Sequence, residues 1–310
     1  MVVMAPLVHF PSTPPRALTR QRKQHDMTVT QIPVPSVPVG AARTMRSAPS
    51  TSGIGRDVMR SEWTRLRTVR STYWTLIGAA IGMVGLGALV SAIYVAQFDK
   101  LTVRDRATFN PVTYGLVGTG LAQFAVGVLG VLVMTNEYAS HMNRATFAAT
   151  PQRLTVLGAR ASVFSVVAFV VTTLAAFGAF FVSQSILSGK NLGVSITSPG
   201  ALRSVVGTGL YLAVLGLIAL GLGTLIRKTA GAIAALFGIL FMVPVIVSLL
   251  PDSISKFQKF LPSSAGQELI FGAGKSTSDV LSPWVGFGVF CLYAVLALTV
   301  AVVALQRRDA

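Results

Sequence analysis

Two neighbouring runs of sequence decide the fold: residues 203–226 read RSVVGTGLYLAVLGLIALGLGTLI, and residues 230–250 read AGAIAALFGILFMVPVIVSLL. Apart from Arg203 at the start, neither run contains a charged residue. About 20 consecutive apolar residues are needed to cross a hydrocarbon core about 30 Å thick. Each run is therefore predicted to be a transmembrane helix, with Arg227 and Lys228 in the short connection between them.

Four more runs of the same kind lie elsewhere in the chain, at residues 74–96, 113–134, 157–183 and 284–305. The overall composition agrees with this pattern, because 52% of the residues are hydrophobic and only 12% are charged. Soluble domains have about a quarter of their residues charged. The sequence therefore predicts an all-α membrane protein with six transmembrane helices, within a domain that covers residues 56–310.

The N-terminal segment, residues 1–55, differs from the rest of the chain. It is rich in Pro, Ser, Thr, Arg and Gln and has no sustained apolar periodicity. Such a segment cannot bury enough apolar surface to fold, so we predict a disordered cytoplasmic tail. It lacks the apolar core and cleavage site of a secretory signal. Met27 is an alternative translation start to Met1.

An amphipathic basic helix is predicted at residues 57–73. Apolar residues recur there at spacings of three and four, while Arg60, Arg65 and Arg67 point elsewhere; the apolar residues are Met59, Trp63, Leu66, Val69 and Tyr73. Helices of this kind lie in the headgroup layer, with arginines near anionic lipid. Membrane lipid is thus one expected partner of the chain.

Glu62 interrupts the apolar side of this interfacial helix. Two readings are open for its carboxylate. It could pair with Arg65 one turn further on, as neighbours on a helix do, or it could anchor a neighbouring cytoplasmic element. The local pairing with Arg65 is the favoured expectation.

The distribution of basic residues predicts the orientation. The formal charge is +16, and the Lys and Arg residues sit in the tail and between the apolar runs. Cytoplasmic segments of membrane proteins carry an excess of such residues. The count favours both termini in the cytoplasm, with the chain a multi-pass protein of the plasma membrane, which is the inner membrane in bacteria. We expect no nucleic-acid partner, because basic residues in the cytoplasmic segments of a membrane protein account for the positive charge.

The predicted spans carry little chemistry of their own. All Asp, Glu and His residues fall outside the six apolar cores, and neutral polar groups such as Gln123 are what enters the bilayer. Ion-coupled carriers and intramembrane enzymes place ionisable side chains at this depth. We therefore expect spans without ionisable groups and a coupling energy supplied from outside. Ser165 is expected to bond the backbone carbonyl one turn back.

The string Gly272-Ala273-Gly274-Lys275-Ser276-Thr277 resembles the end of a phosphate-binding loop. The full pattern needs a glycine at position 269, which is a leucine, and the helix count places the string on the outer face. We reject it as a nucleotide site. The chain is accordingly expected to be no enzyme, with no catalytic residues, no metal site and no cofactor of its own.

Two local features bear on how the helices pack. Gly78 and Gly82 form a small-xxx-small pair, which lets transmembrane backbones approach closely, within the chain or across a dimer. Pro244 lies inside the fifth run and should bend that helix or leave a free backbone carbonyl.

The polar segment at residues 136–153, NEYASHMNRATFAATPQR, joins the second and third predicted spans. It resembles the cytoplasmic loop of ABC transporter permeases of the ABC-2 membrane type. There an acidic-aromatic pair is followed by an Arg-x-Thr and an Ala-Thr-Pro-x-Arg run. Residues 61–71, SEWTRLRTVRS, resemble the interfacial helix that opens such permeases. With the six-span layout, the resemblance covers residues 57–310 and is closest to compact actinobacterial permeases.

The resemblance implies a division of labour. This chain would form half of a dimeric membrane unit with a second copy or a paralogue, while separate ABC ATPase subunits bind ATP and Mg. The residues implied in ATPase coupling are Glu137, Tyr138, Arg144, Thr146 and Arg153. Those implied in the adjoining interfacial helix are Glu62, Trp63, Arg65 and Arg67. The plainer reading is that these charges only solvate a loop.

Residues 251–283 make a long connection that is apolar for a solvated loop. In the resembled family this region carries short helices that dip into the outer leaflet, as an extracellular gate or an interfacial cap. The function expected from the whole sequence is export of a hydrophobic or amphipathic solute. The alternatives are a non-transporting membrane interaction or regulatory protein, and a secondary carrier driven by ions.

Overall fold

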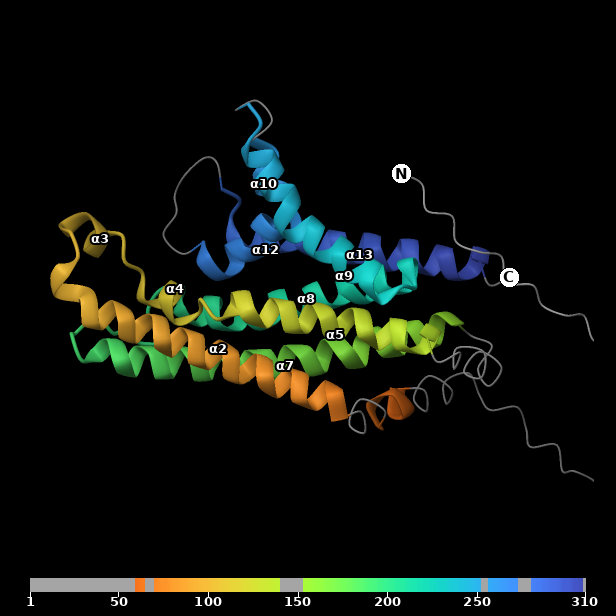
Figure 1. Ribbon diagram of the computed structural model, residues 1–310, viewed down its shortest axis with the longest axis horizontal. Coiled ribbons are helices and arrows are strands. Elements are labelled where there is room, and N and C mark those ends of the chain that lie inside the picture. Colours follow the sequence, from red (N-terminus) through yellow and green to blue (C-terminus); the bar gives the residue numbers. More distant parts are fainter. Residues whose placement is uncertain (1–58, 65–69, 140–152, 252–255, 273–279, 309–310) are drawn as a thin grey trace, which may run out of the picture. The chain divides into compact units, whose positions relative to one another are not determined.

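The computed structural model describes residues 59–64, 70–139, 153–251, 256–272 and 280–308, all of them within one compact unit, Pro49–Ala310. The described residues form helices and connections without a strand, and six helices are long and apolar enough to cross a membrane (Figure 1). The predicted fold class is confirmed: the chain is an all-α membrane protein with six transmembrane helices.

The spanning helices follow the chain in order, joined by short helices. The long elements are α2 (Arg70–Gln97), α5 (Thr119–Ala139), α7 (Arg153–Ser188), α8 (Ala201–Ile226), the fifth span made of α9 (Thr229–Phe237), the π-helix η2 (Gly238–Met242) and α10 (Val243–Ser248), and α13 (Pro283–Arg308). The short ones are η1 (Phe98–Lys100), α3 (Val103–Ala107), α4 (Pro111–Gly115), η3 (Lys256–Phe260) and α12 (Pro262–Phe271).

The helix α8 is the centre of the bundle. It packs against α5, α7, α9, α12 and α13, and most of its residues are buried. Glycines permit the closest approach: a methyl group added at Gly130 of α5 would lie 2.6 Å from the carbonyl oxygen of Gly216 in α8. Without a hydrophobic driving force between helices in lipid, such backbone contact is a main source of packing energy.

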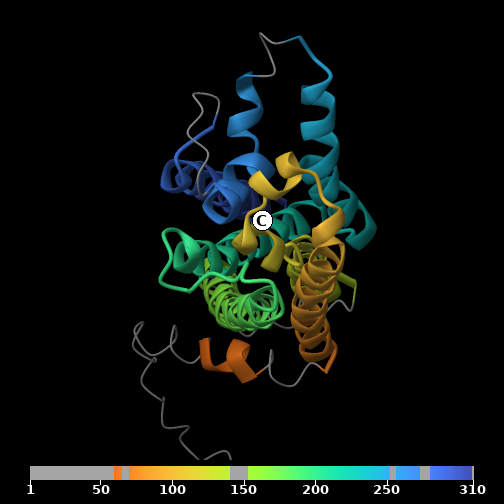
Figure 2. The same cartoon turned by 90° about the vertical axis from the view of Figure 1, so that its left-hand side faces the viewer.

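The helix α2 lies beside α7 and α5 (Figure 2). The described part of α2 begins at Arg70, directly after residues 65–69, which lie outside the described residues, so the boundary predicted at residue 73 stays a prediction. Of the glycine pair, Gly82 packs against the side chain of Leu121 in α5, whereas Gly78 is exposed and would leave a methyl group in open space. The Gly82 contact is thus made within the chain.

The second span starts later than predicted. The chain forms α4, breaks at residues 116–118 and enters α5 at Thr119, whereas a helix from residue 113 was expected. The cause is close packing of glycines: Gly115 approaches Gly87, and Gly118 approaches the backbone of Met83. The turns of the break bond Thr119 N–H to the carbonyl oxygen of Leu116 at 3.0 Å.

The fifth span bends, as Pro244 predicted. Proline lacks the N–H group that would continue the α-helical ladder, and the π-helix η2 lies directly before the α10 turn that contains it. Figure 1 shows α10 leaving the direction of α9. Val245 and Ile246 of α10 are exposed, and so is Leu249 directly after it, to 81%.

The connection between the fifth and sixth spans contains the short helices η3 and α12, in agreement with the helices expected there. α12 packs against α8 and α13, with Ala265, Leu269 and Ile270 buried. Gly266 permits this contact, because an added methyl group would lie 2.8 Å from the ring of Tyr211. The segment is therefore part of the core and more than a surface loop.

We call the end of the bundle that carries η1 and α3 the Asp99 end. There Lys190 Nζ donates to Asp99 Oδ2 at 2.9 Å, which joins the connections after α2 and α7. The pKa of the exposed Asp99 carboxyl is lowered by this hydrogen bond and by the Lys190 charge. Gln184 makes a more buried link: its amide donates to the Pro111 carbonyl at 3.1 Å and accepts from Val194 N–H at 2.9 Å.

Candidate functional site

A buried ion pair joins Glu62 to Arg160 across 98 positions of sequence. Glu62 comes from the helical segment at residues 59–64, and Arg160 comes from the second turn of α7. Arg160 Nη2 donates to Glu62 Oε1 at 2.7 Å, and Arg160 Nε donates to Oε2 at 3.2 Å. The contact is bidentate, the geometry in which arginine binds carboxylate most strongly. We call this end of the bundle the Glu62 end.

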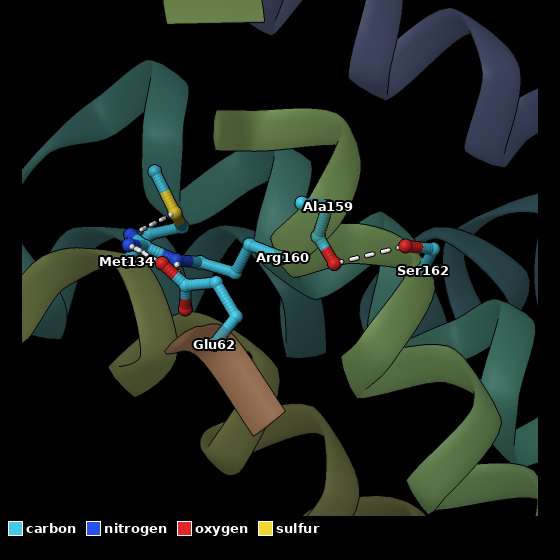
Figure 3. Close-up of polar contacts among 5 residues, drawn as sticks. All are labelled: Glu62, Met134, Ala159, Arg160 and Ser162. Atoms are coloured by element: carbon cyan, nitrogen blue, oxygen red, sulfur yellow. Dashed lines mark hydrogen bonds and ion pairs between the residues drawn. The ribbon is translucent and has the colours of Figure 1, made fainter. Parts of the chain in front are cut away.

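A third helix takes part through Met134 of α5. Arg160 Nη1 lies 3.4 Å from the Met134 sulfur, a weak acceptor. Figure 3 shows the guanidinium group between the Glu62 carboxylate and the Met134 thioether. In the same view the Ser162 hydroxyl donates to the Ala159 carbonyl at 2.9 Å, so it acts only within α7. We call Glu62, Met134 and Arg160 the ion-pair clamp.

The clamp borders an apolar cluster at the Glu62 end. Met134, Leu157, Phe164, Leu220 and Leu305 pack together there, so α5, α7, α8 and α13 all meet. Arg160 is only 2% exposed and Glu62 only 7% exposed. Burying one charge without the other costs several kcal/mol, about 3–5 when a partner is removed. The pairing therefore holds the 59–64 helix against α5 and α7.

The Glu62–Arg160 pair bears on two expectations from the sequence, one about ionisable groups in the spans and one about the partner of Glu62. The spans were expected to contain no ionisable group, but Arg160 lies inside the predicted third span and is buried there, because Glu62 neutralises it. Glu62 was expected to pair with Arg65, which lies outside the described residues. The pairing that the structure does describe is with Arg160, in a neighbouring element.

The other predicted site residues are only partly covered by the structure. Glu137 and Tyr138 lie in the last turn of α5, and Arg153 is the first residue of α7. Arg144, Thr146, Arg65 and Arg67 lie outside the described residues. Backbone continuity puts the clamp close to the predicted coupling segment: Met134 is about one turn before Glu137, and Arg160 about two turns after Arg153.

Trp63, the remaining predicted residue, lies beside the clamp. It is half-exposed and lines an apolar groove of about 380 Å³ with Tyr73 and Leu76 of α2 and Val166 and Val170 of α7. A tryptophan whose ring is partly buried and partly free is typical of a membrane interface. Trp63 thus borders apolar side chains of α2 and α7, and the interfacial role predicted for it stays a prediction.

Sequence reasoning missed the link to Arg160, although a signal was present. An arginine three positions inside a predicted apolar run needs a partner, and Glu62 interrupts an apolar arc in the same way. Their mutual contact depends on tertiary packing.

Within the described residues, no group of three His, Cys, Asp or Glu side chains lies close enough to hold a metal ion.

Comparison with known proteins gives no family assignment. A scan against protein-family models found no match to this sequence, and a search of curated proteins found no significant relative.

Proposed function

We propose that this chain is the membrane-spanning subunit of an ATP-driven exporter of the ABC-2 type, with ATP and Mg bound by a separate ATPase subunit. The observation that carries the proposal is the ion-pair clamp. It fastens an amphipathic segment that precedes the first span to α5 and α7, and these two helices flank residues 140–152. That intervening segment is the one that resembles a coupling helix.

ATP-driven export requires force to pass from the ATPase to the spanning helices. A transporter driven by a separate ATPase needs a stiff connection between the docking segment and the spanning helices, since coupling requires an element with discrete states that both sites bias. A bidentate buried pair fixes distance and orientation better than apolar contact does. The clamp thus makes residues 59–64, α5 and α7 candidates to move as one body.

The buried charges also favour an external energy source. Glu62 and Arg160 are the only charged side chains that are buried among the residues described, and they neutralise each other. A proton-coupled carrier needs a carboxylate or histidine that changes its protonation state during transport. The Glu62 carboxylate is instead engaged by two hydrogen bonds from Arg160, as in a structural ion pair.

The orientation and location follow from charge. We propose that the Glu62 end faces the cytoplasm in the plasma membrane of a bacterium, with both termini on that side. The support is the excess of Lys and Arg predicted for this side, including Arg60, Arg70 and Arg227. The transported solute would be hydrophobic or amphipathic, since the predicted spans supply chiefly apolar and neutral polar surfaces.

A second copy or a paralogue is proposed to complete the membrane unit. Exposed apolar side chains in and beside α10 and η3 support this, because Val245, Ile246, Leu249 and Phe257 are each exposed and α10 contacts η3. Exposed apolar patches of this kind mark interaction surfaces or lipid contact.

Affinity purification from the native membrane, followed by an ATPase assay, tests the proposal. We expect an ABC ATPase to be recovered with the chain and its activity to respond to the permease. Recovery of no ATPase, in a preparation that retains other native complexes, would favour the non-transporting interaction protein instead.

Variants sharpen this test. Glu137→Ala and Arg144→Glu should weaken ATPase association without lowering membrane insertion, because both lie in or beside the proposed docking segment. Arg104→Glu in α3, at the Asp99 end, is the matched control and should leave association unchanged. Equal association of all three variants would contradict the coupling assignment.

A further inference from the structure

A partly open cavity bordered mainly by neutral polar residues lies in the bundle, away from the clamp. It has a volume of about 220 Å³ and is lined by α4, α5, α8 and α12, through Thr113, Thr119, Gln123, Tyr211 and Gln267 together with Val117, Gly120 and Phe271. A cluster of neutral hydrogen-bonding groups at this depth is costly unless the groups are satisfied.

Some of these groups satisfy one another. The Tyr211 hydroxyl donates to Gln123 Oε1 at 2.8 Å, and Gln267 of α12 lines the same cavity. Tyr211 is fully buried, and α12 covers its ring at Gly266. The Tyr211 bond holds Gln123 in place on one side of the cavity, and Gln267 borders it from α12.

Thr119 is the exception. It is 2% exposed and lines the cavity, yet its hydroxyl has no hydrogen-bond partner among the described residues. Thr172 and Thr224 avoid this cost by bonding a carbonyl one turn back, Ala168 at 2.6 Å and Leu220 at 2.9 Å. The Thr173 hydroxyl is also buried without a partner, but it does not line the cavity. Buried polar groups are rarely left unpaired, so the Thr119 hydroxyl indicates a bound species.

The lining restricts the chemistry of that species. No charged side chain lines the cavity. The first amides of α5 are already used, since Gly120 N–H bonds the Val117 carbonyl and Leu121 N–H bonds the Gly118 carbonyl. The cavity therefore offers an anion no free helix amide and offers a cation no carboxylate. An uncharged group with both donors and acceptors fits it best.

The volume of the cavity also limits how large the bound species can be. A volume of about 220 Å³ is below the roughly 300–1,000 Å³ of pockets that enclose a whole drug-sized ligand. It accommodates a headgroup. Beside the cavity, Leu121 and Phe124 of α5 expose apolar side chains that a hydrocarbon chain could follow.

We infer that this cavity binds the uncharged, hydroxyl- and carbonyl-bearing headgroup of an amphipathic molecule, with Thr119, Gln123 and Gln267 as its hydrogen-bonding residues. Two sources share this chemistry: a membrane lipid such as a monoacylglycerol, and a small free polyol. The inference does not depend on the exporter proposal, because it concerns binding and its test measures binding alone.

Photo-crosslinking of the full-length protein in nanodiscs tests the inference. The probe is a monoacylglycerol with a diazirine near its ester group, and the labelled peptides are identified by mass spectrometry. We expect labelling of peptides from α5 and α12 that unlabelled monooleoylglycerol competes away. Oleyl sulfate and oleyltrimethylammonium should compete at least about tenfold more weakly, because a permanent charge cannot be neutralised in this cavity.

Free glycerol distinguishes the two sources. If glycerol competes only at concentrations far above those of monooleoylglycerol, the ligand is a lipid; if it competes equally well, the ligand is a free polyol. Labelling that no competitor reduces, or that charged amphiphiles reduce equally, would overturn the inference and leave water as the occupant.

Thr119→Val is the decisive variant. It keeps the shape of the side chain and removes a hydroxyl that has no protein partner, so a purely structural role predicts unchanged or higher stability. A ligand role predicts that monooleoylglycerol binds about fivefold more weakly, the loss of one hydrogen bond. Thr172→Val is the matched control and should not alter binding. Gln267→Leu should weaken binding too, and unchanged affinity in both cavity variants would contradict the assignment.

Discussion

At the scale of single residues, each of the two buried charges of the ion-pair clamp depends on the other for its stability. Neither Glu62 nor Arg160 can lose its partner without leaving a charge that is both desolvated and unpaired. Removing both charges together is far less costly, because well-packed apolar side chains of similar size replace buried ion pairs with little loss. The clamp should therefore show strong coupling between its two positions.

We predict that Arg160→Leu and Glu62→Leu each lower the free energy of unfolding by about 3–5 kcal/mol, and that the double variant recovers most of this loss. Thermal unfolding in nanodiscs, followed by circular dichroism, measures the effect. Arg104→Leu, an arginine exposed at the Asp99 end, is the control and should change stability by less than about 0.5 kcal/mol. Additive losses in the double variant would refute the coupling.

Gln184 offers a second test at this scale. Its side chain satisfies the Pro111 carbonyl and the Val194 amide, two backbone groups from different connections. Gln184→Leu should cost about 2 kcal/mol, since a buried group without a partner loses about 1–3 kcal/mol. Gln97→Leu, an exposed glutamine near the same end, should be close to neutral. If both variants melt at the same temperature, Gln184 has no such anchoring role.

At the scale of elements, small residues decide which helices can touch. The helix α12 reaches Tyr211 of α8 and Phe290 of α13 only because residue 266 is glycine: an added methyl group would lie 2.8 Å and 3.0 Å from their rings. Contacts this short force the ring or the helix to move.

We predict that Gly266→Ala lowers the free energy of unfolding by about 1–3 kcal/mol by pushing α12 away from α8. Gly288→Ala in α13 is the matched control, since its methyl group would meet nothing within 4 Å and alanine favours the helix. We expect the control to be neutral or slightly stabilising in the same thermal unfolding assay. Equal effects of the two substitutions would show that the α12 contact tolerates extra volume.

The bend in the fifth span can be tested by measuring the distance between its two ends. A straight helix would separate residues 230 and 248 by about 27 Å, at about 1.5 Å per residue. Spin labels at Ala230→Cys and Ser248→Cys, in a Cys291→Ala background, should report a shorter distance. Pro244→Ala should lengthen it, because it restores the missing N–H group. An unchanged distance would mean that the bend is imposed by packing rather than by Pro244.

At the scale of the whole molecule, the hydropathy pattern predicted the number of spans correctly. It did not predict features that depend on contacts between helices. The late start of α5 follows from Gly118 approaching the backbone of Met83, a contact that no periodicity reveals. The neutral polar residue Gln123 was expected inside the bilayer, but its partner Tyr211 lies 88 positions away. Ser165 bonds the Ser162 carbonyl at 3.0 Å, in agreement with the local expectation.

The candidate site was less predictable than the fold for the same reason. Glu62 was singled out because it interrupts an apolar arc, and the neighbour nearest in sequence was favoured as its partner. The partner that the structure describes, Arg160, is brought to it by the packing of α7 against α2 and α5. The local sequence pattern indicated that Glu62 needs a partner. Only the packing of the helices shows that Arg160 is a partner.

The proposed orientation can be tested on intact cells. In a Cys291→Ala background, a membrane-impermeant maleimide should label Ala107→Cys, which is exposed in α3 at the Asp99 end. It should not label Gln306→Cys, which is exposed near the end of α13 beside Leu305 of the clamp cluster, until the membrane is permeabilised. The reverse labelling pattern would place both termini outside and contradict the exporter topology.

The distance in sequence between Glu62 and Arg160 has a consequence for biosynthesis. At about 5–20 residues per second, a ribosome completes Arg160 about 5–20 s after Glu62. An arginine entering the membrane within the third helix is unfavourable, although less so near a helix end than at its centre. Until the third helix arrives, the segment before the first helix must wait at the membrane surface. The ion pair thus sets an order of assembly, in which the N-terminal segment docks only once half of the spans have been made.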